Sequence, residues 1–179
     1  MRVLGRPPVV IGALAVLVLV VATVLAGEPA LLVTLLPTAV MLLVKPAAPA
    51  SGTVNAFCGH LIAVCSGYLA TGMFGLLYSH AGFADQGLRR LLAMVFALVV
   101  TIALMLWGGV PHPPALISTL AVSYGTLTGL RQLAILLAAV LVLSGLRLLA
   151  PRITSVLTRP AAPDEATREQ VRKALDKQR

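Results

Sequence analysis

The chain alternates between long apolar segments and short connections rich in proline, glycine or charged residues. The four longest apolar segments are 9–26, 55–78, 91–107 and 133–150. Each is close to the roughly 20 residues that an α-helix needs to cross a hydrocarbon core of about 30 Å. The pattern therefore predicts an all-α polytopic membrane protein with four transmembrane helices.

Two further apolar segments, 30–44 and 115–124, are shorter. The first contains Pro37, and Pro113 and Pro114 directly precede the second. Proline fixes φ and lacks an N–H donor, so it can begin a helix but interrupts one from inside. The segment 115–124 would rise only about 15 Å as a helix, about half of the hydrocarbon core. We therefore expect two short re-entrant or broken helices that enter and leave on one face.

The order long, short, long occurs twice, in units of about 9–78 and 88–150. The likeness is one of layout and not of residue identity. Duplicated units with interrupted helices are typical of transporters, whose binding site lies where the units meet. The pattern predicts one transmembrane domain over residues 1–150, built from two pseudo-repeats, followed by a basic cytoplasmic tail with a short helix at 151–179.

Composition supports the membrane assignment. Hydrophobic residues make up 59% of the chain and charged residues 11%, with a mean hydropathy of +0.97. Soluble domains carry about 25% charged residues, so this class is excluded. The net charge is +8, and residues 147–179 hold eight basic and four acidic residues, a net +4. This tail has no aromatic residue, so we expect it to contact anionic membrane lipids and not nucleic acid.

The basic residues also predict an orientation. With re-entrant short segments, Arg89, Arg90 and both termini share one side, while Lys45 and Arg131 fall on the other. If the short segments cross instead, Arg89 and Arg90 move outside, against the positive-inside rule. We therefore expect a multi-pass protein of the cell membrane with four spans and both termini cytoplasmic.

Ionisable residues are rare inside the apolar segments, and the main candidates are His60 and His112. Polar groups at membrane depth are costly and indicate function. A histidine can carry a proton or donate a hydrogen bond to an anion, and the helix start after Pro114 would add unpaired N–H groups. The predicted substrate-binding residues are His60, His112, Asn55, Thr38, Pro113, Pro114, Ser118 and Thr119. His112 also suits a purely structural role, as a rigid turn whose imidazole caps a carbonyl.

No enzyme is expected. Paired carboxylates and a phosphate-binding loop are missing from the sequence, and the only nucleophile and base pairing is Ser118 or Ser123 with His112. Cys58 and Cys65 lie two helical turns apart, too far for a disulfide, and no further ligand at metal-binding spacing accompanies them. No metal and no cofactor are therefore expected.

Two motifs resemble the HPP family of integral membrane proteins. His112-Pro113-Pro114-Ala115 follows an apolar helix, and a second block reads 38–42, then Pro46 and Pro49, then Asn55 and Gly59-His60. The resemblance covers about residues 9–150. Family members commonly carry Gln-Pro-Arg before the Asn, where this chain has Gly52-Thr53-Val54.

The resemblance implies a small four-span membrane protein, and nitrite transport is proposed for photosynthetic members of the family. We therefore expect a transporter or channel for a small inorganic anion such as nitrite, working as a homo-oligomer. The alternative is a membrane scaffold or accessory subunit whose basic tail docks a partner. A transporter should leave a polar cavity beside His60 and His112, whereas a scaffold should pack them against protein.

Overall fold

The computed structural model describes residues 7–45, 47–79, 87–157 and 176. Regular structure in this part of the chain is entirely helical, which confirms the predicted fold class. The elements are α1 (Pro7–Ala26), α2 (Ala30–Val44), the 3₁₀ helix η1 (Pro49–Ser51), α3 (Thr53–Met73), α4 (Gly87–Trp107), α5 (Ala115–Tyr124) and α6 (Leu130–Leu157).

Four of these helices, α1, α3, α4 and α6, are long and apolar enough to cross a membrane, as expected. Several boundaries differ from the sequence-based prediction: α3 ends at Met73 and not at residue 78, and α6 begins at Leu130 and not at residue 133. Helix α6 continues past Pro151 to Leu157, and α4 begins at Gly87, so Arg89 and Arg90 belong to a helix and not to a connection. The short helix expected at about 164–177 lies outside the described residues, apart from residue 176.

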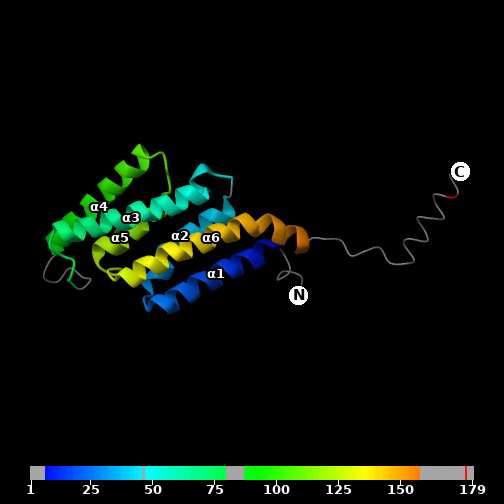
Figure 1. Cartoon of the computed structure of the whole chain (residues 1–179), viewed down its shortest axis with the longest axis horizontal. Coiled ribbons are helices and arrows are strands. Elements are labelled where there is room, and N and C mark those ends of the chain that lie inside the picture. The colour runs from blue at the N-terminus through cyan, green and yellow to red at the C-terminus, as the bar shows by residue number, and fades with distance from the viewer. Residues whose placement is uncertain (1–6, 46, 80–86, 158–175, 177–179) are drawn as a thin grey trace.

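Consecutive helices run in opposite directions (Figure 1). A guanidinium nitrogen of Arg131, at the start of α6, donates to the carbonyl of Leu25 at the end of α1, at 2.7 Å. Gly125, just after α5, lies against the Arg90 guanidinium near the start of α4. Each short helix therefore links opposite ends of the bundle. This path differs from the re-entrant one that was expected, and the membrane face on which each segment ends stays a prediction.

The short helices can link the two ends because non-helical segments supply the remaining length. Residues 108–114 connect α4 to α5 without a regular helix, and His112 within them is fully buried. Irregular backbone at membrane depth is tolerated only where protein covers it. The sequence-based prediction compared only the helix 115–124 with the thickness of the hydrocarbon core and left out residues 108–114. As a result, Arg89, Arg90 and Arg131 share one end of the bundle, and Lys45 and Arg152 the other.

The packing of the six helices follows a repeated pattern. Helix α1 packs on α2 and α6, α4 packs on α5 and α3, and α2 and α3 each contact both α5 and α6. Exchanging α1 with α4, α2 with α5 and α3 with α6 leaves this set of packed pairs unchanged: α2–α5 and α3–α6 map onto themselves, and the other pairs map onto one another. Because the helices alternate in direction, the units that contain α1 to α3 and α4 to α6 run in opposite senses.

Glycine allows close contact between α3 and the segment around α5. A Cβ atom on Gly67 would lie 2.8 Å from the Cβ of Val122, and one on Gly59 would lie 2.7 Å from the Cβ of His112. Small residues at such crossings are how membrane helices approach one another closely. This contact brings the buried faces of α3 and α5 together, and the candidate site lies between them.

Candidate functional site

Four buried polar side chains meet where α2, α3 and the start of α5 converge. Thr38 comes from α2, His60 from α3, His112 from the segment before α5, and Ser118 from α5. Each is 0% exposed to solvent. We call this group the histidine cluster. All four belong to the set predicted from the sequence.

The histidine cluster is a continuous chain of hydrogen bonds. The Ser118 hydroxyl lies 2.7 Å from His60 Nδ1, and His60 Nε2 lies 2.8 Å from the Thr38 hydroxyl. The same hydroxyl is 3.4 Å from His112 Nε2, and His112 Nδ1 is 2.7 Å from the carbonyl oxygen of Ala50. The two imidazole rings are 5.2 Å apart between centroids.

One arrangement of hydrogen atoms gives every group in this chain a partner. The carbonyl of Ala50 can only accept, so His112 Nδ1 carries the hydrogen and, in a neutral ring, Nε2 accepts from Thr38. The Thr38 oxygen then accepts from His60 Nε2–H, and His60 Nδ1 accepts from the Ser118 hydroxyl. The tautomers are thus inferred from the bonding pattern. The carbonyl of Ala50 fixes the direction of the whole chain.

The loop that carries Ala50 is held by its own hydrogen bonds. The Ser51 hydroxyl is buried and donates to the carbonyls of Lys45, at 2.7 Å, and Met41, at 3.1 Å, at the end of α2. The Asn55 amide donates to the carbonyl of Pro49 at 2.8 Å. These contacts fold η1 against α2 and α3, so that the Ala50 carbonyl reaches His112.

The start of α5 differs from the expectation of unpaired N–H groups. The N–H groups of Ala115, Leu116 and Ile117 donate to the carbonyls of residues 112, 113 and 114, at 3.0 to 3.1 Å. The tight turn through the prolines brings these carbonyls within reach. The first turn of α5 is therefore occupied and does not present the anion site that was expected there.

The other predicted site residues fall into two groups. Thr119 lies beside the cluster on α5, and its hydroxyl is 3.0 Å from that of Thr101 on α4. Asn55 binds its own loop, and Pro113 is exposed, so neither joins the cluster. Pro114 caps the start of α5. Ser118 pairs with His60 and not with His112, its partner in the nucleophile and base pairing of the enzyme hypothesis that was not favoured.

A buried arginine was missed by the sequence analysis. Arg90 is 1% exposed and lies against Gly125, directly after α5. Gly125 has φ +93°, and a Cβ there would lie 2.7 Å from Arg90 Nη1, so glycine is needed for both reasons. Buried hydroxyls of α5, including Thr119 and Ser123, lie between the cluster and this arginine. An arginine at the start of an apolar helix ordinarily anchors at the membrane interface. No feature of the sequence therefore indicated that Arg90 would be buried.

The cluster contains no carboxylate. In the described parts of residues 7–157, Glu28 is the only acidic residue, and it bonds the N–H of Ala30 at the start of α2. Among all described residues, no group of three His, Cys, Asp or Glu side chains could hold a metal ion. The cluster therefore offers hydroxyl and imidazole groups with no fixed negative charge.

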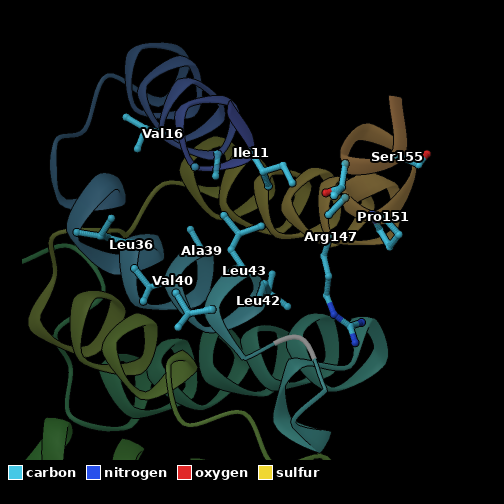
Figure 2. A pocket seen from close by; sticks show the side chains of 15 residues that line it. Ile11, Val16, Leu36, Ala39, Val40, Leu42, Leu43, Arg147, Pro151 and Ser155 are labelled. Atoms are coloured by element: carbon cyan, nitrogen blue, oxygen red, sulfur yellow. The ribbon is translucent and has the colours of Figure 1, made fainter. Parts of the chain in front are cut away.

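A groove of about 900 Å³ lies on another side of α2, between α1, α2 and α6. Figure 2 shows apolar side chains of α1 and α2 pointing into it, with Arg147 of α6 at its edge. Ala39 and Leu42 line the groove, whereas Thr38 on the same helix faces the histidine cluster. Helix α2 therefore separates the groove from the cluster. Neither this groove nor a smaller cavity of about 370 Å³ between α1 and α6 is lined by the two histidines.

Comparison with known proteins gives one match. The family model described as "HPP, transmembrane region" matches residues 7–161, most of the chain. A search of curated proteins and a search of solved structures found no match.

Proposed function

The chain belongs to the HPP transmembrane family, and from this premise we propose that it is a membrane transporter for a small inorganic anion, with nitrite among the candidates. The observation that carries the proposal is the histidine cluster. Thr38, His60, His112 and Ser118 come from distant parts of the sequence and are all fully buried within an apolar bundle.

Two properties of the histidine cluster bear on its substrate: its polar side chains are costly to bury, and none of them is a carboxylate. Polar side chains inside a membrane bundle are expensive to bury and mark substrate or ion pathways by default. A cation pathway is ordinarily lined with carboxylates or carbonyls. The cluster has no carboxylate, and the one carbonyl that bonds to it, that of Ala50, already accepts from His112. The imidazole and hydroxyl groups of the cluster can turn a donor toward a negative charge once one of their internal hydrogen bonds is released, and a histidine can take up a proton. These properties favour an anion over a metal cation as the substrate.

The surroundings of the cluster support a route for the anion that opens when α2 moves. The rings are fully buried and neither the groove nor the smaller cavity is lined by them, which favours the scaffold, the alternative expected to pack them against protein. As a transporter, the protein would be in a conformation closed around the rings. Helix α2 is short, contains Pro37, and has the groove on another face. We further propose that the two units are inverted repeats, an arrangement in which one unit moves against the other around a fixed site. A shift of α2 would then open the cluster toward the groove.

Uptake of anions into proteoliposomes tests this proposal. Purified protein is compared with His60→Ala and His112→Ala for nitrite, nitrate, formate and chloride, with protein-free vesicles as the blank. The matched control is Ser66→Ala, because Ser66 is a buried hydroxyl on α3 with no hydrogen-bond partner among the described residues. We expect uptake of at least one anion, lost in both histidine variants and kept in the control.

A second function, a non-transporting scaffold, is favoured by one further observation. Every polar group of the histidine cluster is already bonded within the protein. Such a closed network also suits a rigid core that holds α2, α3 and α5 together. If the folded wild-type protein takes up none of the four anions, the scaffold is preferred, and the basic tail becomes the segment to test for partners.

A further inference from the structure

The number of hydrogen-bond donors in the histidine cluster limits what the cluster can offer to a bound anion. The neutral cluster has four hydrogens to donate, on Ser118 Oγ, His60 Nε2, Thr38 Oγ1 and His112 Nδ1. It makes four hydrogen bonds, of which the last ends on the Ala50 carbonyl. All four donors are therefore engaged, and the neutral cluster has none to offer to an anion.

We propose that the cluster binds its anion only together with one proton, so that the protein carries a monovalent anion and a proton as an electroneutral pair. The inference rests on the proposed function as an anion transporter and names the ion that accompanies the substrate. It concerns the same buried site and requires no other group to change its charge.

A single added proton changes the donor count. If it binds the lone pair of His60 Nδ1, the new N–H donates to Ser118 Oγ, and the Ser118 O–H is released and can rotate toward a ligand. If it binds His112 Nε2, the Thr38 O–H is released in the same way. No other bond is broken. In either case the cluster gains one positive charge and one spare donor, which match a monovalent anion.

The groups that face the two rings offer no other positive charge. Helix α2 contributes Thr38, η1 the Ala50 carbonyl, α5 Ser118, and α4 the Met105 methyl, which lies beside Gly59 next to the His112 ring. None of these carries a charge, and each ring is the only titratable neighbour of the other among these contacts.

The nearest buried arginine cannot replace the proton. Arg90 lies against Gly125, directly after the last residue of α5. The cluster lies toward the other end of that ten-residue helix: Ser118 is seven residues before Gly125, about 10 Å by helix rise, and His112 precedes the helix. An isolated anion buried without a counter-charge is strongly disfavoured. A proton on the histidine pair supplies that charge at the site, and leaves with the anion.

The test uses proteoliposomes with a pH indicator inside and nitrate or nitrite as the probe anion. We expect each anion that enters to acidify the lumen by one proton. A lumen one pH unit more alkaline should drive about tenfold accumulation, the limit for one-to-one coupling. A membrane potential set with potassium and valinomycin should leave uptake unchanged. Protein-free vesicles measure the passive entry of the neutral acid, which is subtracted.

Three variants make the test specific for the cluster. His60→Gln and His112→Gln each keep an amide for hydrogen bonding but cannot take a proton, and Ser118→Ala removes a donor that a proton on His60 would release. Loss of the pH-driven accumulation in His60→Gln and Ser118→Ala places the proton on His60, and loss in His112→Gln alone places it on His112. Retention of the accumulation in all three variants would overturn the inference, and the Ser66→Ala control should keep it. Wild-type uptake that follows the membrane potential and ignores the pH gradient would overturn this inference and leave anion transport standing. Absence of all uptake in folded wild-type protein would overturn both.

Discussion

Replacing Thr38 with valine should destabilise the protein through its two histidine partners. Valine has the size and shape of threonine but lacks the hydroxyl that accepts from His60 and donates to His112, at 2.8 and 3.4 Å. The substitution therefore leaves one buried donor and one buried acceptor without partners. Each such group costs about 1 to 3 kcal/mol. Because the second bond is long, we expect a loss of about 2 to 4 kcal/mol in the free energy of unfolding.

Thr34→Val is the matched control for this prediction. Thr34 lies one turn earlier on α2 and is 1% exposed, against 0% for Thr38. Its hydroxyl donates only to the carbonyl of Ala30 in its own helix, at 2.7 Å. That carbonyl keeps its ordinary helical partner when the hydroxyl is removed. The control should therefore lose less than about 1 kcal/mol.

The assay is equilibrium unfolding in mixed detergent micelles with increasing sodium dodecyl sulfate, followed by circular dichroism for the wild type and both variants. Both variants lose one hydroxyl from α2. The difference between their free energies of unfolding therefore measures the hydrogen bonds that Thr38 makes to the two histidines. Equal stability of the two variants would refute the reasoning, because it would mean that the Thr38 hydroxyl does not hold the rings.

Three further predictions concern packing, the η1 loop and topology. Gly67→Ala should push α3 and α5 apart by about 0.6 Å, from 2.8 Å to an ordinary contact of 3.4 Å, and lower stability by about 1 to 3 kcal/mol. Gly145→Ala, where a Cβ meets nothing within 4 Å, should be neutral or stabilise by up to about 1 kcal/mol in thermal unfolding. Equal melting temperatures for these two variants would contradict the close contact. Ser51→Ala should release the Ala50 carbonyl from His112, seen as faster backbone hydrogen exchange in 50–52; unchanged exchange there would argue against a holding role. Single cysteines at Lys45 and Glu28, in a protein without Cys58 and Cys65, should react with an impermeant reagent from opposite sides, and labelling from one side would contradict the alternating path.

The sequence predicted the helices well because the signals were strong and local. Long apolar runs specify spanning helices almost regardless of their neighbours, and Pro113 and Pro114 mark the start of α5 directly. The path of the short helices was harder to predict. It depends on residues 108–114, whose irregular backbone connects α4 to α5; His112 in this segment is buried, while Gly108, Gly109, Pro111 and Pro113 are exposed. No local pattern distinguishes such a connection from a loop at the membrane surface.

The members of the histidine cluster were predicted in part, for a similar reason; their role in binding stays a prediction. Thr38, His60, His112 and Ser118 were found because polar side chains inside apolar segments are rare. Asn55 was included from its place in a motif, yet its amide binds its own loop. The carbonyl of Ala50 could not have been predicted, because every residue has one and only the tertiary fold aims it at His112. The burial of Arg90 likewise depends on the space that Gly125 leaves for it.

The most direct test of the account is a nitrogen NMR spectrum of the histidine rings, recorded with and without anion. The chain has three histidines, so with His80 replaced by glutamine the spectrum reports His60 and His112 alone. Without anion, the account predicts a hydrogen on Nε2 of His60 and on Nδ1 of His112, two different tautomers. Addition of nitrate or nitrite at mildly acid pH should convert one ring to the doubly protonated form. Two identical tautomers, or spectra that no anion changes in the folded protein, would contradict the claim that this cluster is the anion site.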